Sequence, residues 1–320
     1  MTEFMKKTAI LFPGQGSQYV GMGQAFAEAD DEAAAVLNLA EHISSFPIRR
    51  LCFEGPIDEL TRVLYLQPAL TAVNLICWQQ LRKRLPGFAP TFLAGHSLGE
   101  YSALHAAGVL TVEDTLALVT RRGELMEREG NAHPGGMRAV VGLTIDEVEA
   151  ALAGYAGPGE AVVANHNTAT QIVLSGDEQG LDRVAGLCAG RGAKVIPLKV
   201  SVANHSPLVA GAVDDFAAFM AGIPFRQPET PVLFNVTGDA ADEASAIRAI
   251  MARQIASRVR WLTIIERMLA EGVEVFVELG PKNVLAGMMK KILPKGSSVV
   301  CLQADTPESL DKVAEVLAAG

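Results

Sequence analysis

The chain has 320 residues, of which 49% are hydrophobic and 20% are charged, so it can bury a large core in one large domain and a smaller one. Its formal net charge of −9 disfavours general nucleic-acid binding and attraction to an anionic membrane. The four cysteines contain no C-x-x-C pair, which argues against a zinc site or a disulfide framework. The sequence has no recognisable signal peptide or membrane-length apolar run, so we expect a cytoplasmic protein without a bound metal.

The first predicted element is a strand over residues 8–12, an apolar run suited to burial on both faces. The glycine-rich loop 13–18 follows and leads to a helix near residues 20–29. This loop lacks the lysine of a P-loop and the glycine spacing of a dinucleotide fingerprint, so a phosphate cradle is disfavoured. It could instead bring a backbone amide close to a ligand, as one donor of an oxyanion hole. A plain turn between a strand and a helix is the alternative.

Residues 30–66 are predicted to form helices and loops. Pro68 suits the first position of a helix that runs to about Leu85, because proline needs no hydrogen-bond acceptor there. Arg82, Lys83 and Arg84 close this helix, where cations complement the helix dipole. We therefore interpret this basic run as a solvated helix end rather than a binding patch.

The strongest local motif is Gly95-His96-Ser97-Leu98-Gly99, which matches the G-x-S-x-G nucleophile elbow. An apolar strand ending near Ala94 precedes it, and a helix over residues 98–107 follows, as the elbow requires. The glycines permit a tight turn that exposes the serine, and the helix N-terminus offers an unpaired amide for an oxyanion. The pattern predicts a nucleophilic serine, with an ordinary glycine-lined turn as the alternative.

Thr111–Asp114 opens a helix that is predicted to reach about Glu129. Arg121 lies on a charged stripe of this helix, whereas Arg122 interrupts the apolar stripe of Leu118 and Leu125. An inward-facing charge needs an anionic partner, and the neighbouring stripe residues supply none. Arg122 is thus a candidate clamp for a substrate carboxylate. A structural ion pair with a distant acid is the alternative.

Residues 131–200 change character and predict the order βαββαβ of a ferredoxin-like unit. The predicted ranges are strands 137–143, 161–165, 171–175 and 194–200, with helices 146–152 and 178–191. We interpret this unit, residues 131–200, as a subdomain inserted into a large domain made of residues 1–130 and 201–320. In the second part of that domain we predict strands 232–236, 273–279 and 298–302, helices 246–256, 262–271 and 283–292, and a C-terminal helix.

A serine nucleophile needs a base, and histidine is the usual one. Of the six histidines, His205 ends the strand-like run 200–204, where the chain returns to the large domain, and it follows the serine in chain order. A structural or surface histidine is the alternative reading. No clear acid is available to orient it, although a backbone carbonyl would suffice.

Four stretches together resemble the malonyl-CoA:acyl carrier protein transacylase family, and the similarity runs nearly end to end. They are Phe12-Pro-Gly-Gln-Gly-Ser-Gln18, Gly95-His-Ser-Leu-Gly-Glu-Tyr-Ser-Ala103, Val200-Ser-Val-Ala-Asn-His205 and Glu278-Leu-Gly-Pro281, with Gln67-Pro-Ala-Leu70 in addition. The resemblance implies an α/β fold, in which a hydrolase-like large domain with a mostly parallel sheet carries the inserted ferredoxin-like subdomain.

The same resemblance implies the site. Ser97 resembles the acylated nucleophile, His205 its base and Arg122 the partner of the malonyl carboxylate, while the backbone amides of Gln15 and Leu98 would form the oxyanion hole. Asn167 would line the same cleft. In some members a glutamine precedes the aromatic residue at the position of Arg260, and the main-chain carbonyl there accepts from the histidine. The arginine leaves the role of this position open.

The implied reaction transfers malonyl from malonyl-CoA to the phosphopantetheine thiol of acyl carrier protein through a malonyl-serine, without a cofactor, for fatty acid or polyketide synthesis. We also expect a monomer.

An acidic carrier would need a local basic patch, for which lysines 282, 290, 291 and 295 are candidates, with a solvated helix end as the alternative. A serine hydrolase or thioesterase using the same pair is the second reading, and a non-catalytic acyl-CoA-binding subunit is the third.

Overall fold

The computed structural model describes residues 6–200 and 202–319 and contains two separate four-stranded sheets. The strands are β1 (Thr8–Phe12), β2 (Phe92–Gly95), β3 (Gly136–Val141), β4 (Ala161–Thr168), β5 (Gln171–Gly176), β6 (Lys194–Pro197), β7 (Val275–Leu279) and β8 (Val300–Ala304). The helices are α1 (Gln24–Ala29), α2 (Asp31–Ser44), α3 (Ile48–Glu54), α4 (Ile57–Leu60), α5 (Val63–Arg84), α6 (Gly99–Ala106), α7 (Val112–Ala132), α8 (Ile145–Ala153), α9 (Glu178–Gly190), the 3₁₀ turn η1 (Pro207–Val209), α10 (Ala212–Ala221), α11 (Ala244–Gln254), α12 (Trp261–Ala270), α13 (Val284–Ile292) and α14 (Pro307–Ala318).

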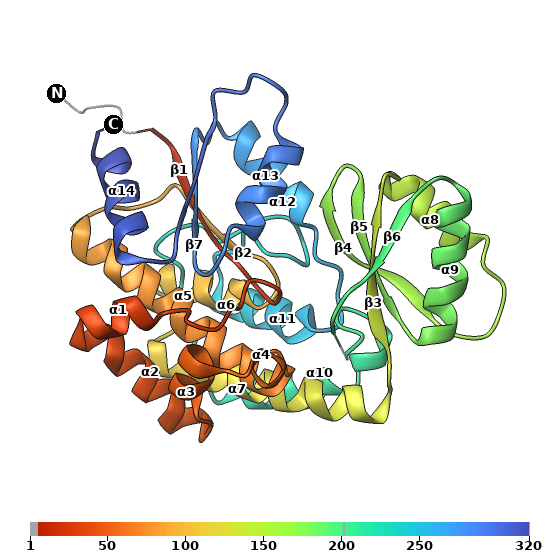
Figure 1. The fold of residues 1–320 in the computed structure, drawn as a ribbon, viewed down its shortest axis with the longest axis horizontal. Coiled ribbons are helices and arrows are strands. Elements are labelled where there is room, and N and C mark those ends of the chain that lie inside the picture. The colour runs from red at the N-terminus through yellow and green to blue at the C-terminus, as the bar shows by residue number, and fades with distance from the viewer. Residues whose placement is uncertain (1–5, 201, 320) are drawn as a thin grey trace.

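The first sheet is parallel, with the order β2-β1-β7-β8, and β1 lies at its centre with all five residues buried. Ile10 and Phe12 join the core formed with α5, α6 and α7, whereas Ala9 and Leu11 join the core formed with α12 and α13. Helices therefore cover both faces (Figure 1). This arrangement explains why β1 reads as a continuous apolar run rather than an alternating one.

The second sheet is antiparallel, with the order β4-β5-β3-β6. Helices α8 and α9 pack on one face through a core that includes Val140, Ile172 and Leu181. This sheet and its two helices lie to one side of the parallel sheet (Figure 1). We call residues 136–197 the small sheet unit.

The small sheet unit is joined to the larger body through β4. The amide of Val259 donates to the carbonyl of Ala164 (2.8 Å), and the amide of His166 donates to the carbonyl of Val259 (2.9 Å). These two backbone hydrogen bonds form a parallel bridge between Asn165 of β4 and Val259. Asn167, two residues further along β4, contacts His96 just after the end of β2.

Several predicted boundaries are wrong. Helix α5 begins at Val63 rather than Pro68, so the proline lies inside the helix and leaves the carbonyl of Leu64 without its usual donor. Helix α7 packs against this turn so closely that a Cβ on Gly123 would lie 3.3 Å from that carbonyl. Tertiary packing thus overrides the local preference of proline for a helix start.

The predicted strand 232–236 forms only isolated bridges, through Val232 beside β2 and through Leu233. It ends early because the chain turns back, with the amide of Phe234 donating to the carbonyl of Asp239 (3.0 Å).

The expectation that residues 200–204 are strand-like is also wrong for the residues described. Val202 to His205 form a bent loop, and Ser201 lies outside the described residues. Helix α10 was not predicted.

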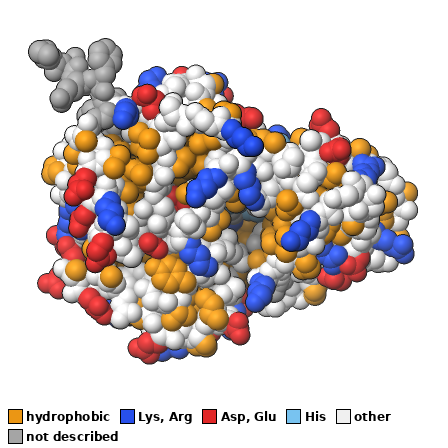
Figure 2. Space-filling view, turned by 45° about the horizontal axis from the view of Figure 1, so that its top comes forward, with side chains coloured by type: hydrophobic (Ala, Val, Ile, Leu, Met, Phe, Trp, Pro, Cys, Tyr) orange, Lys and Arg blue, Asp and Glu red, His pale blue; other side chains and the backbone are white. Residues whose placement is uncertain are grey.

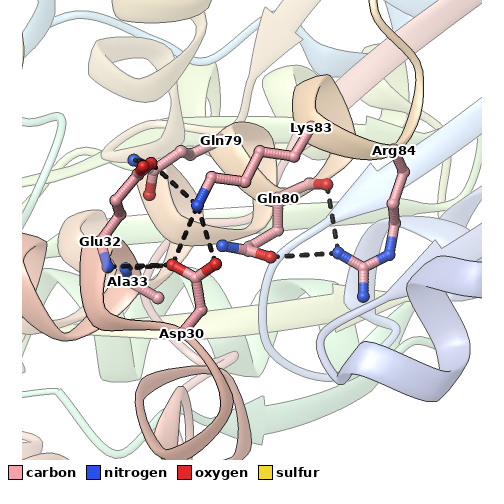
Figure 3. Close-up of polar contacts among 7 residues, drawn as sticks. All are labelled: Asp30, Glu32, Ala33, Gln79, Gln80, Lys83 and Arg84. Atoms are coloured by element: carbon pink, nitrogen blue, oxygen red, sulfur yellow. Dashed lines mark hydrogen bonds and ion pairs between the residues drawn. The ribbon is translucent and has the colours of Figure 1, made fainter.

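The basic end of α5 is a solvated helix end, as the sequence indicated. Lys83 lies between Asp30 and Glu32, with Nζ–O distances of 2.7 and 2.8 Å, and Arg84 donates to the side chain of Gln80 (Figure 3). Asp30 in turn caps α2 by accepting from the amides of Glu32 and Ala33. Lys83 therefore ties α5 to α2, whereas Arg84 pairs with Asp311 of α14. Across residues 6–200 and 202–319, no helix is long and apolar enough to span a bilayer.

Candidate active site

The turn between β2 and α6 holds Ser97 in the left-handed region, with φ of 51°. A Cβ on Gly95 would lie 1.9 Å from the backbone of Gly99, and a Cβ on Gly99 would lie 2.1 Å from the carbonyl oxygen of Phe12. Both glycines are therefore required for this close approach of β1, β2 and α6. The strained turn presents the serine side chain at the carboxyl end of the parallel sheet.

His205 faces this serine, with 2.7 Å between its Nε2 and Ser97 Oγ. Its Nδ1 lies 2.9 Å from the carbonyl oxygen of Ser257 and 3.1 Å from that of Gln254. Since carbonyls only accept, Nδ1 must carry the proton, which leaves the lone pair of Nε2 for the serine hydroxyl. Main-chain oxygens thus do the orienting that a carboxylate does in a Ser-His-Asp triad.

The resemblance implied that the main-chain carbonyl of Arg260 accepts a hydrogen bond from His205, and this is wrong. The amide of Arg260 donates to the carbonyl of Asn235 (2.9 Å), its carbonyl accepts from the amide of Ile264, and its side chain is directed to the carbonyl of Val236. The carbonyls that reach His205 come instead from the end of α11 and the turn after it. The contact to the histidine thus lies a few residues earlier in the chain than the family resemblance implies.

Burial and, to a smaller extent, the positive charge of Arg122 together lower the pKa of His205 to about 3. The imidazole is therefore neutral near pH 7 and able to accept a proton. It is 4% exposed, so the Ser97–His205 contact lies largely out of bulk water.

Arg122 is 2% exposed and points to the same place. Its Nη1 donates to Gln67 Oε1 (2.9 Å), and its Nη2 donates to Gln254 Oε1 (3.1 Å) and lies 3.4 Å from Ser97 Oγ. Within residues 6–200 and 202–319, no carboxylate forms an ion pair with it. The alternative of a structural ion pair is thereby excluded for the described residues, and the buried guanidinium is available to an anion. Arg121, in contrast, pairs with Glu124 on the surface.

The loop after β1 lies against the elbow. A Cβ on Gly14 would be 2.3 Å from the carbonyl oxygen of His96 and 3.6 Å from the amide nitrogen of Leu98. The amides of Gln15 and Leu98 have no hydrogen-bond acceptor in the part of the chain that the structure describes. The two N–H groups are therefore free to donate to a ligand oxygen.

Asn167 reaches the elbow from the small sheet unit. Its Oδ1 lies 2.9 Å from Nε2 of His96, and the His96 ring packs edge-on against Trp261 at 5.3 Å. Burial lowers the pKa of His96. The contact keeps His96 turned away from Ser97 Oγ and links the small sheet unit to the nucleophile turn.

Three further side chains, for which the sequence alone indicates no role, surround the elbow. Asn235 accepts from the amide of Ser97 through Oδ1 (2.7 Å) and donates to the carbonyl of Gly95 (2.8 Å). Gln254 donates to the carbonyl of Ser97 (2.8 Å) and to Glu100 Oε2 (2.7 Å). Asn235 and Gln254 lie outside any motif, whereas Glu100 follows the elbow directly and belongs to the family pattern.

The space next to this cluster opens to solvent. A cavity of about 240 Å³ is lined by Gln15, Val200 and Val202, and its charged lining residues are Arg62, Lys199 and Asp58. Figure 2 shows a hollow between the larger body and the small sheet unit with several lysine and arginine side chains around it. An anionic ligand would meet favourable charge on this side of the molecule.

Comparisons with known proteins agree with this geometry. The profile of the family described as "Acyl transferase domain" matches residues 10–312. The malonyl CoA-acyl carrier protein transacylase of Haemophilus influenzae is 38% identical over 291 residues, covering 90% of this chain and 93% of that protein. The protein of the same name from Bacillus subtilis is 35% identical over 306 residues, covering 95% and 96%.

Two solved structures are similar over nearly the whole chain. The malonyl CoA-acyl carrier protein transacylase from Coxiella burnetii superimposes with a TM-score of 0.93 at 32% identity, over 99% of both chains. A malonyl-transacylase solved in complex with a type II polyketide acyl-carrier protein gives a TM-score of 0.91 at 33% identity, over 97% of this chain and 99% of that one.

Proposed function

This chain belongs to the malonyl CoA-acyl carrier protein transacylase family of acyl transferases, and on that premise we propose that it moves a malonyl group from malonyl-CoA to the phosphopantetheine thiol of an acyl carrier protein. The observation that carries the proposal is the position of Arg122, a buried guanidinium without a carboxylate partner among the described residues and 3.4 Å from Ser97 Oγ. A Ser-His pair alone would suit any acyl group, whereas this cation favours an acyl group with a free carboxylate.

In the first half-reaction, Nε2 of His205 takes the proton of Ser97 while Oγ attacks the thioester carbonyl. The carbonyl oxygen becomes an oxyanion, for which the amides of Gln15 and Leu98 are the proposed donors. The tetrahedral intermediate collapses as the C–S bond breaks, and His205 gives its proton to the departing coenzyme A thiolate. A malonyl ester of Ser97 remains.

The second half-reaction reverses these steps with a new thiol. His205 takes the proton of the phosphopantetheine thiol, the sulfur attacks the ester carbonyl, and Ser97 leaves with the proton from His205. Because its pKa is low, the imidazole is neutral at the start of each half-reaction and carries the proton only within it. The reaction needs no cofactor beyond its two thiol carriers.

Arg122 is proposed to bind the malonyl carboxylate in both half-reactions. A bidentate pair in a buried site rejects an acetyl group, which would leave the guanidinium without an anion. The same pair holds the acyl-enzyme in one orientation, with the ester carbonyl at the two amides.

Mass spectrometry tests the proposal directly. Incubation with malonyl-CoA should add one malonyl group on Ser97, with a single burst of coenzyme A, and the adduct should disappear when holo acyl carrier protein is added. Steady release of coenzyme A and free malonate without an acceptor thiol would favour the thioesterase reading. Absence of any adduct in the wild-type protein, or an adduct that persists in Ser97→Ala, would refute the proposal.

We further propose that the carrier docks along α13. The side chains of residues 282, 290, 291 and 295 are exposed. Lys282 donates to the carbonyl of Gly16 in the loop beside Gln15 (3.3 Å), and Lys291 lies 3.4 Å from Gln171 of the small sheet unit. The basic surface thus spans the opening between the two parts of the molecule, where a carrier must deliver its thiol.

Charge reversal tests this surface. Lys282→Glu should raise the KM for the carrier severalfold and flatten its dependence on salt, because the long-range attraction is lost. Lys312→Glu makes the same change of charge on α14, which lies on the side away from the small sheet unit (Figure 1), and should leave the KM unchanged. Equal effects of the two variants, or salt-independent rates in the wild type, would contradict docking at α13.

The small sheet unit is proposed to be the ferredoxin-like insertion, with residues 1–130 and 201–320 forming the hydrolase-like domain. Its chain order β3-α8-β4-β5-α9-β6 and strand order β4-β5-β3-β6 support this assignment. We propose that it contributes Asn167 to the cleft, and that the enzyme acts as a cytoplasmic monomer.

A further inference from the structure

Beneath the nucleophile turn lies a glutamate that the proposed reaction does not use. Glu100, in the first turn of α6, is completely buried. Its Oε1 accepts from the amide of Asn235 (2.7 Å), and its Oε2 accepts from Nε2 of Gln254 (2.7 Å). A buried carboxyl is costly for a fold, so one placed directly under the reacting serine calls for an explanation.

Gln254 connects this carboxyl with Ser97 and Arg122 through its side chain and with His205 through its main chain. Its Nε2 also donates to the carbonyl of Ser97 (2.8 Å), its Oε1 accepts from Arg122 (3.1 Å), and its main-chain carbonyl accepts from His205 Nδ1 (3.1 Å). Both atoms of the amide are therefore used. A carboxylate only accepts and a guanidinium only donates, so the amide satisfies Glu100 and Arg122 in one orientation alone.

Arg122 itself carries a buried charge that is only partly satisfied. Two neutral glutamine oxygens accept from it, the ring centroid of Tyr101 lies 5.7 Å from Cζ, and its Nε has no partner within the described residues. Burial raises the pKa of Glu100 to about 7, and the positive charge of Arg122 offsets part of that rise. Burial likewise lowers the pKa of Arg122, and the charge of Glu100 is among the groups that offset part of that fall. The Gln254 amide stands between them.

This separation has a functional consequence. A direct ion pair would occupy the guanidinium edge that a substrate carboxylate needs, whereas removal of the acid would leave an uncompensated buried cation. A carboxylate set back by one amide lowers the cost of the charge without forming an ion pair with the guanidinium.

We propose that Glu100 is a positioning residue that fixes the Gln254 amide and so holds Arg122 oriented for the carboxylate of the acyl substrate. This inference rests on the proposed malonyl transfer. It assigns Glu100 no contact with the substrate and no proton transfer.

Glu100→Gln tests the assignment with almost no change of shape. The new NH₂ group must face either the amide of Asn235 or Nε2 of Gln254, both donors. Rotation of the Gln254 amide relieves the second conflict but turns its NH₂ toward Arg122. We expect the KM for malonyl-CoA to rise about 10- to 100-fold, the loss of one hydrogen bond to a charged group, while Ser97 acylation by acetyl-CoA changes little.

Glu278→Gln is the matched control. Glu278 is 1% exposed and accepts from the amides of Leu285 and Ala286, so the same substitution creates the same conflict of donors away from Arg122. Glu278→Gln should lower the midpoint of unfolding about as much as Glu100→Gln does. It should not change the ratio of the KM for malonyl-CoA to the KM for acetyl-CoA. Rates are normalised to the active fraction, measured from the coenzyme A burst.

A double-mutant cycle asks whether Glu100 acts through Gln254. Gln254→Met removes the amide and should itself raise the malonyl KM, and adding Glu100→Gln in that background should change the malonyl-to-acetyl KM ratio by less than about 2-fold. Additive effects of the two substitutions, or an unchanged ratio in Glu100→Gln, would overturn the inference. If Glu100→Gln does not fold, an unchanged ratio in Gln254→Met overturns it instead. If Ser97 of the wild-type protein does not accept malonyl, the proposed function fails. That result differs from failure of the Glu100 inference, in which the wild-type protein is acylated normally.

Discussion

Replacing Arg122 with methionine should cost the enzyme its preference for malonyl over acetyl groups. Methionine keeps much of the buried stem and removes the guanidinium. The donors Nη1 and Nη2 already make hydrogen bonds of 2.9 and 3.1 Å to Gln67 and Gln254, so the group is held in place before substrate binds. Little ordering entropy remains to be lost on binding, which favours a large contribution to specificity.

The magnitude follows from the hydrogen bonds that the substrate carboxylate can no longer form. Two charge-assisted hydrogen bonds to a carboxylate contribute about 1.5–3 kcal/mol each, so kcat/KM for malonyl-CoA should fall about 10²- to 10⁴-fold. Acetyl-CoA has no carboxylate, and its kcat/KM should change by less than about 10-fold.

The assay measures transfer to holo acyl carrier protein, and separately the rate at which Ser97 is acylated by each thioester. Arg121→Met is the matched control, since Arg121 is the adjacent residue but pairs with Glu124 on the surface at 2.9 Å. It should behave as wild type with both substrates. Equal losses for malonyl-CoA and acetyl-CoA in Arg122→Met would refute the reasoning, because they would mean that Arg122 supports the elbow rather than the carboxylate.

Two further outcomes follow from the structure. Acylation of Ser97 by an uncharged thioester should vary less than about 2-fold between pH 5 and 8, because His205, with a pKa of about 3, stays neutral; an ordinary histidine would lose about 30-fold in its neutral form at pH 5. Gly99→Ala should lower the free energy of unfolding by about 1–3 kcal/mol, because its Cβ would lie 2.1 Å from the Phe12 carbonyl. Gly287→Ala, whose Cβ meets nothing within 4 Å, should not destabilise the protein in the same denaturant titration. A rate that falls with a midpoint near pH 6.5, or equal stability of both alanine variants, would contradict these arguments.

Much of the fold could be predicted because the signals are local. The all-apolar run of β1 and the glycines around Ser97 each specify a conformation within a few residues. The inward position of Arg122 followed from helical periodicity, which depends only on spacing. The start of α5 could not be predicted this way, because the packing of α7 against its first turn overrides the preference of Pro68.

The side chains that hold the site together were missed for a related reason. Asn235 and Gln254 contact the elbow from 138 and 157 residues away in the chain. Neither lies in a pattern that marks it, and an asparagine or a glutamine near a helix end is usually solvated. Only the folded chain shows that both are fully buried. The same holds for Glu100, whose proximity to the elbow was evident while its partners were not.

By itself the amino-acid sequence determined the α/β class, the nucleophile turn, and Ser97 and Arg122 as candidates, since each depends on backbone geometry or helical spacing over a short range. It indicated His205 through its position after the serine in chain order, although the strand expected before it is a bent loop. Only the tertiary structure decided that His205 is oriented by the carbonyls of residues 254 and 257 and that Arg122 meets amides instead of an acid. Hydrogen bonds between distant segments depend on how helices and loops pack, and no local pattern encodes that packing.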